Sequence, residues 1–454
     1  MMAETIAVID IGKTNAKVVL VDGESFRELA VRTMKNGVVD APPYPHFDTE
    51  RLWAFILESL RALHAERTID RISVATHGAT AALVDKDGGL ALPVLDYEHA
   101  GPQELSAEYE ALRPAFAETG TPKLPVGLNA GMQLYWQSRR FPEAFAKVAA
   151  ILMYAQYWSF RLTGVLAGEV TSLGCHADLW EPANHRYSTL VTRQGWQRLM
   201  PSLRKASDVL GAVRADVAAV TGLHRETPVH CGIHDSNASL LPYVLTTPSP
   251  YAVVSTGTWV VLMAMGATPK ELDEHRDTLV NVNALGDPVP SARFMGGRAF
   301  SLLGGSNALV GDTAIANVLA SQAMILPSIP GDSGPYPGQE ARWTIDRGQL
   351  GEDEAQVAIA FHLALMSATC LSLIGADGPS IVEGPFAANV PYLAMLKAAT
   401  GRDVFVGESA TGTSIGAACL AVENVPKPRL RQVEESLPEA AVAYIQKWRD
   451  LADN

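Results

Sequence analysis

Cysteine is scarce in this sequence, and its four residues among 454 are widely scattered: Cys175, Cys231, Cys370 and Cys419. They form no CxxC pair and no Cys/His cluster with the spacing of metal ligands. The pattern therefore gives no indication of a zinc-binding domain or a disulfide framework. We expect four reduced thiols inside the core.

Basic residues are also in deficit, because 36 Lys and Arg oppose 49 Asp and Glu and leave a net charge of −13. Such a charge does not suit non-specific binding of nucleic acid or anionic membrane, although a local basic pocket for phosphates stays compatible with it. Residues 1–10 lack the basic start and apolar core of a secretory signal, and the uncharged run 251–267 is short of a membrane span. We expect a cytoplasmic protein with no nucleic-acid or membrane partner.

The sequence also lacks charge runs, coiled-coil heptads and low-complexity tracts, so neither a filament nor a disordered tail is indicated. Its 454 residues, of which 48% are hydrophobic, exceed what one core supports. They fit two domains of about 200 residues each. Strand-like and helix-like stretches alternate along the chain, which predicts an α/β fold.

The chain opens with two β-rich runs in residues 6–22, which flank the tight loop Gly12, Lys13, Thr14 and Asn15. Small residues let backbone N–H groups approach phosphate oxygens, and a carboxylate such as Asp10 can hold a hydrated metal ion. This pattern predicts a site for phosphate and magnesium. The Walker sequence GxxxxGK[ST] is absent, and an ordinary surface hairpin remains the alternative.

Residues 48–66 carry an N-cap acid and apolar residues three and four apart, which predicts an amphipathic helix. Two short strands are expected around His77 and Gly78. A third apolar run ends at Asp96 and Glu98, which either bind hydroxyl groups or are simply solvated. An isolated histidine at a strand end is more often a structural residue than a ligand.

The region from about 103 to 225 is expected to be mostly helical, with breaks at Pro and Gly. Its aromatic residues include Trp136, Tyr154, Tyr157 and Trp158. We expect these four side chains to lie in the core rather than to form a platform for stacking a sugar.

Asp235 lies where a β-leaning run, residues 227–233, meets an apolar helical pattern, residues 236–245. Ser236 and Asn237 are the candidate N-caps of that helix. A carboxylate at such a junction lies at the carboxyl edge of a sheet, where open α/β folds bind ligands. Asp235 is therefore a candidate base for a substrate hydroxyl, and a helix-capping role alone is the alternative.

A Pro/Ser-rich stretch at residues 246–250 is typical of a linker, and a second hairpin is expected at 251–266 with Gly257 and Thr258 in its turn. This hairpin repeats the order of the first: apolar strand, turn of small and hydroxyl residues, apolar strand. We interpret the two hairpins as parts of two related domains, each contributing one phosphate-binding turn.

The second half offers further candidates. Arg298 follows two glycines and either approaches a ligand or lies on a surface loop. Helices are expected at 307–324 and 353–375. Residues 380–421 then predict strand, glycine turn, helix, strand and helix, with the turn Glu383–Ala387 near Asn389 and a Gly/Thr loop at 411–413.

In this order the segments DIGKTNAK, GIHDSNA, STGTW, EGPFAAN and GTSIGAA resemble the FGGY carbohydrate kinases of the sugar kinase/actin/Hsp70 superfamily. The resemblance covers nearly the whole chain and is closest to the rhamnulokinase-like and fuculokinase-like branches, which act on ketoses or deoxyketoses. It implies two actin-like, ribonuclease H-like α/β domains on either side of a catalytic cleft. The domains would be 1–246 for sugar and base and 251–435 for nucleotide, followed by a helix at 436–454.

The resemblance also implies a role for each matching residue. Asp235 would be the general base, and Asp10 would bind Mg²⁺ through water. The residues implied to hold ATP are Gly12, Lys13, Thr14, Asn15, Gly257, Thr258, Gly384, Ala387 and Asn389. Those implied to lie in the sugar region, together with Asp235, are His77, Gly78, Asp96 and Glu98, and Arg298 is a further substrate-binding candidate.

The implied activity is ATP- and Mg²⁺-dependent phosphorylation of a rhamnulose-, fuculose- or xylulose-type sugar by a monomer or homodimer. The THGAT segment departs from the xylulokinase and glycerol kinase patterns, so the sugar stays open. The rival interpretation is an actin- or Hsp70-like ATPase, or a degenerate kinase-fold protein, that acts through a protein partner.

Overall fold

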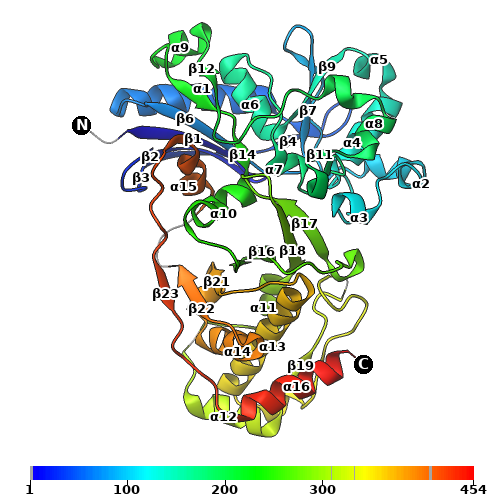
Figure 1. Cartoon of the computed structure of the whole chain (residues 1–454), viewed down its shortest axis with the longest axis vertical. Helices are drawn as coiled ribbons and strands as arrows, with labels where there is room; N and C mark the ends of the chain where they lie inside the picture. The colour runs from blue at the N-terminus through cyan, green and yellow to red at the C-terminus, as the bar shows by residue number, and fades with distance from the viewer. Residues whose placement is uncertain (1–3, 308, 332, 408–411, 454) are drawn as a thin grey trace. The chain divides into compact units, whose positions relative to one another are not determined.

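The computed structural model describes residues 4–307, 309–331, 333–407 and 412–453. The chain divides into two compact units, and each is an α/β unit (Figure 1). Unit 1 comprises Met1–Thr247, Val280–Pro288 and Ala410–Lys427, and unit 2 comprises Pro248–Leu279, Val289–Ser409 and Pro428–Asn454. Each unit is therefore built from segments that are distant in the sequence.

Unit 1 is organised around one sheet in the order β12-β13-β6-β1-β2-β3, with β14 also paired to β6. In chain order its strands are β1 Thr5–Ile11, β2 Asn15–Asp22, β3 Glu28–Lys35, β6 Arg71–Thr76, β12 Val209–Ala212, β13 Pro228–His230 and β14 Ile233–His234. The pairs β1–β2 and β2–β3 are antiparallel, whereas β6 runs parallel to β1, β13 and β14. The predicted first hairpin is confirmed.

Strand β1 shows why this sheet is covered on both faces. Alternate side chains point to opposite faces of a strand. Ala7 and Ile9 enter a core formed with α1 (Thr49–Glu66) and α6 (Tyr154–Thr163), whereas Ile6 and Val8 enter a second core. That second core is formed with the helices α10 Asp235–Thr246 and α15 Thr413–Ala418.

The rest of unit 1 is less helical than expected. Between 103 and 225 the chain also forms strands, namely β9 Val148–Met153, β10 Trp180–Glu181, β11 Arg186–Tyr187 and β12. Strand β9 pairs with β7 Ala81–Asp85, which pairs with β8 Leu90–Leu92. The helices here are α2 Ser106–Glu110, α3 Phe116–Thr119, α4 Ala130–Arg140, α5 Pro142–Phe145, α7 Val170–Leu173, α8 Thr189–Arg193 and α9 Ala215–Thr221. The core placement of Trp136, Tyr154, Tyr157 and Trp158 is confirmed, since each is at most 3% exposed.

A second sheet, formed mainly by residues of unit 2, has the order β17-β18-β16-β15-β21-β22-β23. Its strands are β15 Tyr251–Thr256, β16 Val260–Met265, β17 Thr278–Val282, β18 Pro288–Phe294, β21 Ser380–Glu383, β22 Val404–Gly407 and β23 Leu430–Gln432. The second hairpin is confirmed as β15 and β16. The helices are α11 Gly296–Leu302, α12 Asp312–Ser321, α13 Glu352–Leu373, α14 Val390–Thr400 and α16 Ala440–Ala452.

Helix α13 is the central helix of this unit. It contains an uncharged run, residues 355–376, that is longer than the run 251–267 considered above. By length and composition it could cross a membrane, and it is the one such helix within the described residues. Its apolar window is 83% buried inside the protein, so α13 has the environment of a core helix.

Two local predictions need correction. Helix α10 begins at Asp235 with His234 at the N-cap, so neither Ser236 nor Asn237 caps it. The capping pattern was wrong because the strand β14 extends as far as His234, which leaves no turn for a later cap. In the predicted 411–413 loop, Thr411 lies outside the described residues and α15 begins at Thr413.

The contact of α10 with α15 yields a test of packing. A Cβ atom at Gly416 would lie 1.7 Å from the backbone oxygen of Ala238, so no side chain fits there. We expect Gly416→Ala to lower the free energy of unfolding by about 1–3 kcal/mol, the usual cost of overpacking. Gly412→Ala is the matched control, because no atom of the described residues lies within 4 Å of its added Cβ. Chemical denaturation of both variants measures the difference, and equal stability would contradict the close packing.

Candidate functional site

Parallel pairing brings three chain segments to one edge of the unit 1 sheet. Ala75 of β6 pairs with Asp10 of β1 on one side and with Ile233 of β14 on the other. The chain therefore leaves the sheet at neighbouring points, with His77 after β6 and Asp235 after β14. This is the carboxyl edge of the parallel strands, where open α/β sheets place their ligand sites.

Asp235 is the first residue of α10, and its side chain is 29% exposed. Its Oδ1 accepts a hydrogen bond from the N–H of Ser236 at 2.6 Å and lies 3.3 Å from Nε2 of His234. Because a helix N-terminus favours negative charge, the carboxylate is held at this position while part of it stays open to solvent. Such a carboxylate can accept a proton from a bound hydroxyl group.

Asp10 is a second carboxylate at this edge. Burial, together with repulsion from Asp235, raises its pKa to about 6, and a hydrogen bond from Ser414 opposes the rise. A nearby cation would relieve both effects. The described residues contain no group of three or more His, Cys, Asp and Glu able to hold a metal alone. Asp10 therefore fits the kind of Mg²⁺ that keeps most of its waters and takes few protein ligands.

His234 is buried, and several elements of unit 1 hold it in place. Its backbone N–H donates to Oγ1 of Thr171 at 3.0 Å, and the hydroxyl of Thr171 donates to the buried carboxylate of Glu169. Burial disfavours an imidazolium, but the neighbouring Cys175 and Asp235 outweigh it and raise the pKa of His234 to about 9. The neighbouring thiol and carboxylate thus favour the protonated form of the His234 imidazole.

Cys175 was expected to be a reduced core thiol, and that expectation is confirmed. It is a buried free thiol, but His176 and His234 flank it. Burial raises the pKa of the thiol, and the two imidazoles reverse that effect and lower the pKa to about 5. The Cys-His and His-Asp dipeptides were visible in the sequence, but their approach depends on the tertiary fold.

His77 and Gly78 lie beside this cluster. The His77 ring is buried, its Nδ1 faces the Gly78 oxygen at 3.0 Å, and burial lowers its pKa to about 4. Within the described part of the chain its Nε2 has no hydrogen-bond partner. A Cβ at Gly78 would lie 2.6 Å from Nε2 of His234, so this glycine makes room for the His234 ring.

The first turn, residues 12–15, is closed by a backbone hydrogen bond, and its Lys13 side chain contacts the 96–98 segment. The N–H of Gly12 donates to the oxygen of Asn15 at 2.9 Å. The ammonium of Lys13 contacts the carboxylate of Asp96 and lies 3.2 Å from Glu98. Burial and the carboxylates of Glu98, Asp235 and Asp96 together raise the pKa of Tyr97 to about 12. The predicted sugar residues Asp96 and Glu98 thus share one neighbourhood with Asp235.

In unit 2 the second turn lines a cavity of about 430 Å³. Its lining residues are Gly257, Thr258, Gly297, Arg298, Phe300, Ser301, Pro385 and Phe386. Arg298 was expected among the substrate-binding residues, but the fold groups it with this turn, where its N–H donates to the Thr258 oxygen at 3.4 Å. Arg298 and Thr258 bring a positive charge and a hydroxyl group to one cavity, a combination that suits a phosphate.

The turn after β21 has a structural requirement of its own. Gly384 has a φ of +80°, and a Cβ there would lie 2.0 Å from the Thr256 oxygen. Asn389 caps α14 by accepting from the N–H of Tyr392 at 3.0 Å, and it also lines a cavity of about 140 Å³. Ala388 lines that cavity, whereas the predicted Ala387 is not among its lining residues.

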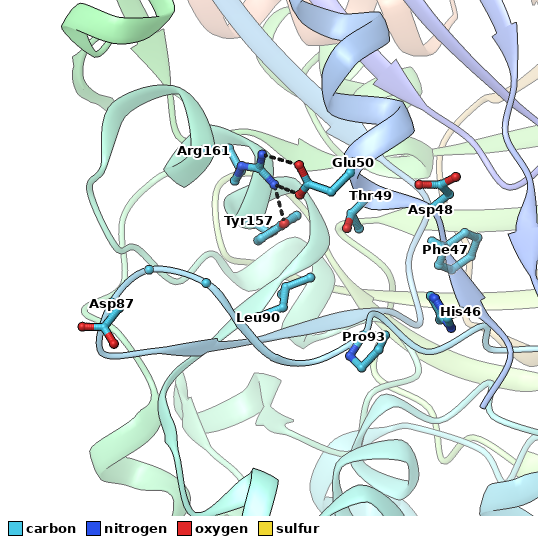
Figure 2. Close-up of a pocket in the computed structure, with 12 residues that line it drawn as sticks. His46, Phe47, Asp48, Thr49, Glu50, Asp87, Leu90, Pro93, Tyr157 and Arg161 are labelled. Atoms are coloured by element: carbon cyan, nitrogen blue, oxygen red, sulfur yellow. Dashed lines mark hydrogen bonds and ion pairs between the residues drawn. The ribbon is translucent and has the colours of Figure 1, made fainter. Parts of the chain in front are cut away.

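Another cavity in unit 1, of about 580 Å³, is drawn in Figure 2, and its lining residue Phe47 also packs against His77. Its guanidinium, Arg161, lies 2.8 Å from Glu50 and 2.9 Å from the Tyr157 hydroxyl. None of the predicted site residues lines this cavity.

Comparison with known families gives two matches. Residues 5–242 match the N-terminal domain of the FGGY family of carbohydrate kinases, and residues 248–429 match the C-terminal domain of carbohydrate kinase FGGY. Among curated proteins, the chain is 24% identical over 277 residues to L-fuculokinase of Escherichia coli K12. It is 26% identical over 269 residues to xylulose kinase of the same strain. These matches span 58% and 53% of those relatives' lengths, and 59% and 57% of this chain.

Among solved structures, a carbohydrate kinase from Novosphingobium aromaticivorans is similar over the whole chain, with 34% identity, a TM-score of 0.91 and 99% coverage of that chain. A xylulose kinase from Rhodospirillum rubrum shares the fold at 20% identity and a TM-score of 0.78, with 99% and 98% coverage. These neighbours confirm the two-domain, actin-like α/β fold class. Since the two family models together match most of the sequence, this chain belongs to the FGGY family of carbohydrate kinases.

Proposed function

We propose that this protein transfers the γ-phosphoryl group of ATP to a hydroxyl of a small ketose or deoxyketose in the cytoplasm. The observation that carries the proposal is the meeting of Asp10, His77 and Asp235 at one sheet edge in a chain of the FGGY family. The relatives named L-fuculokinase and xylulose kinase support a sugar of rhamnulose, fuculose or xylulose type.

In this proposal Asp235 is the general base. Its carboxylate accepts the proton of the attacking hydroxyl as the sugar oxygen approaches the γ-phosphorus in line. Part of the carboxylate is open to solvent, and His234 holds one of its oxygens at 3.3 Å. Asp96, Glu98 and His77 would bind the other hydroxyl groups, because they surround the same region of unit 1.

The nucleotide would be held by the two turns. Thr14 of the first turn and Thr258 of the second offer hydroxyl groups, and Gly12, Asn15 and Gly257 would let the phosphates approach the backbone closely. Arg298 would add a charge on the second side, and Gly384 and Asn389 would lie near the adenosine. Asp10 would hold Mg²⁺ through water, and the ion when bound neutralises charge on the phosphates.

These assignments divide the work between the two halves of the chain. We propose that residues 1–246 carry the sugar site and the base, and that residues 251–435 carry most of the nucleotide site. The actin- or Hsp70-like alternative keeps both turns and needs no base for a small molecule. The match to FGGY models over both halves favours the kinase.

The first test replaces the proposed base. We expect Asp235→Asn to lower turnover at least about a hundredfold, the usual scale for a lost general base, with little change in ATP affinity. Asp87→Asn, on the exposed turn between β7 and β8, is the matched control and should leave turnover unchanged. Steady-state kinetics and calorimetric titration provide both values. Turnover within a few-fold of the wild type would remove Asp235 from the mechanism.

The second test adds bulk at the second turn. A Cβ at Gly257 would have only the Trp259 oxygen nearby, at 3.6 Å, so Gly257→Val should fold while blocking close approach of a phosphate. We expect weaker binding of a non-hydrolysable ATP analogue and an unchanged melting temperature. Gly348→Val is the control, since its Cβ would meet only Asp346 at 3.5 Å. Unchanged nucleotide affinity in the folded Gly257 variant would refute the assignment.

The third test identifies the acceptor class. With Mg²⁺ present, five- and six-carbon ketoses and deoxyketoses should raise ATP consumption well above its basal rate, whereas glycerol and aldohexoses should do little. A coupled assay of ADP release over such a panel measures this. Stimulation by a protein partner with no response to any sugar or polyol would favour the ATPase alternative.

A further inference from the structure

The Lys13 side chain starts in the first turn but ends among residues of the 96–98 segment. Its ammonium contacts Asp96, lies 3.2 Å from Glu98, and stands 4.6 Å and 5.1 Å from the ring centroids of Tyr97 and Phe47. The Lys13 and Asp96 side chains are only 22% and 11% exposed. Two carboxylates and two aromatic faces thus enclose one ammonium.

Such an enclosure does not suit a phosphate ligand. To reach a phosphate, Lys13 would have to leave Asp96, and the removal of one partner from a partly buried ion pair leaves an uncompensated charge behind. The backbone of the turn does not share this constraint, since its N–H groups approach a ligand without moving Lys13. The turn can therefore hold phosphate while the Lys13 side chain serves another group.

The neighbours of the enclosure belong to the sugar region. His77 packs against Tyr97 and Phe47 with ring centroids 5.4 Å and 5.1 Å apart, and its buried Nε2 lacks a partner within the described part of the chain. A buried polar atom without a partner is rare and indicates that something outside the chain can satisfy it. A sugar hydroxyl has the right size and hydrogen-bonding capacity.

We propose that Lys13 is a specificity-determining residue for the acceptor, which orients Asp96 and Glu98 toward sugar hydroxyls, and that the site takes neutral ketoses and rejects sugar acids. The inference rests on the proposed kinase function and narrows its substrate class. Lys13 is fully engaged by two carboxylates, so the segment keeps a surplus negative charge. A carboxylate on the substrate would be repelled by that surplus negative charge.

This distinction matters because related kinases differ in this respect. One relative is an L-xylulose/3-keto-L-gulonate kinase of Escherichia coli K12, 25% identical over 272 residues, and a gluconate kinase from Lactobacillus acidophilus shares the fold. Both neutral sugars and sugar acids are thus named among proteins of this fold. The charge of the 96–98 segment decides between them for this chain.

The first experiment separates a sugar role from a phosphate role. We expect Lys13→Gln to raise the KM for a neutral ketose about tenfold or more, while the KM for ATP stays within about threefold. A phosphate-binding Lys13 predicts the reverse split, with a raised KM for ATP alone, and that result would overturn the proposal. Lys13→Arg should recover part of the acceptor affinity, because it restores the positive charge.

Two further measurements keep this test interpretable. Lys86→Gln, on the exposed turn between β7 and β8, is the matched control and should change neither KM. If Lys13→Gln lowers the melting temperature, Asp96→Asn is tested in its place. That variant removes one of the two carboxylates proposed to bind sugar hydroxyls and keeps the Lys13 ammonium. It too should raise the acceptor KM and spare the KM for ATP, and the opposite split would again overturn the proposal.

The second experiment compares neutral and acidic acceptors with the wild-type enzyme. Ketoses and keto-aldonates of equal carbon number form matched pairs, and we expect kcat/KM to favour the neutral member at least about a hundredfold. Asp96→Asn should lower the ratio of kcat/KM for the neutral acceptor to kcat/KM for the acidic one, because it removes a negative charge from the segment. Equal or better use of the acids would refute the charge argument. Failure of every acceptor would instead refute the kinase function itself, so the two failures are distinguishable.

Discussion

The parallel pairing of β6 with β1 on one side and β14 on the other is the constraint on which the site depends. It aligns Asp10, Ala75 and Ile233 across three strands, so the chain segments that follow must emerge together. A slip of one residue would send alternate side chains to the opposite face and bury Asp10 in an apolar layer. The two cores that cover β1 resist such a slip, because each accepts only its own set of apolar side chains.

Features that depend on neighbouring residues in the sequence were predicted correctly. The two hairpins and the strand-to-helix position of Asp235 follow from side-chain periodicity and turn residues, and each is present in the structure. The short strands β10 and β11, which pair with each other, were missed, and β9 was missed because its pairing partner, β7, is distant in the sequence. The same reason hid the contacts of His234 with Thr171 and Cys175, since no local spacing joins residues some sixty positions apart.

The glycines show how structure separates roles that sequence cannot. Gly257 is exposed and has open space around its Cβ position, so packing gives no reason for its small size. Gly384, Gly78 and Gly416 are each required by a neighbouring atom of the fold itself. A resemblance treats Gly257 and Gly384 alike as nucleotide residues. Packing does not explain the glycine at position 257, so a ligand-binding role stays a prediction there. At position 384 the close Thr256 oxygen alone explains why the residue is glycine.

The buried carboxylate of Asp10 lowers the stability of the native state when it is ionised, and a nearby cation would offset this effect. The folded-state pKa of Asp10 is about 6, above its ordinary value of 3.8. The unfolded chain thus releases this proton more readily, and the native state loses stability as pH rises from about 3.8 through 6. Above about pH 6, Asp10 is ionised and remains buried near the carboxylate of Asp235. His234 directly contacts Asp235 and offsets the negative charge of that carboxylate. A positive ligand near Asp10 would therefore stabilise the native state at neutral pH.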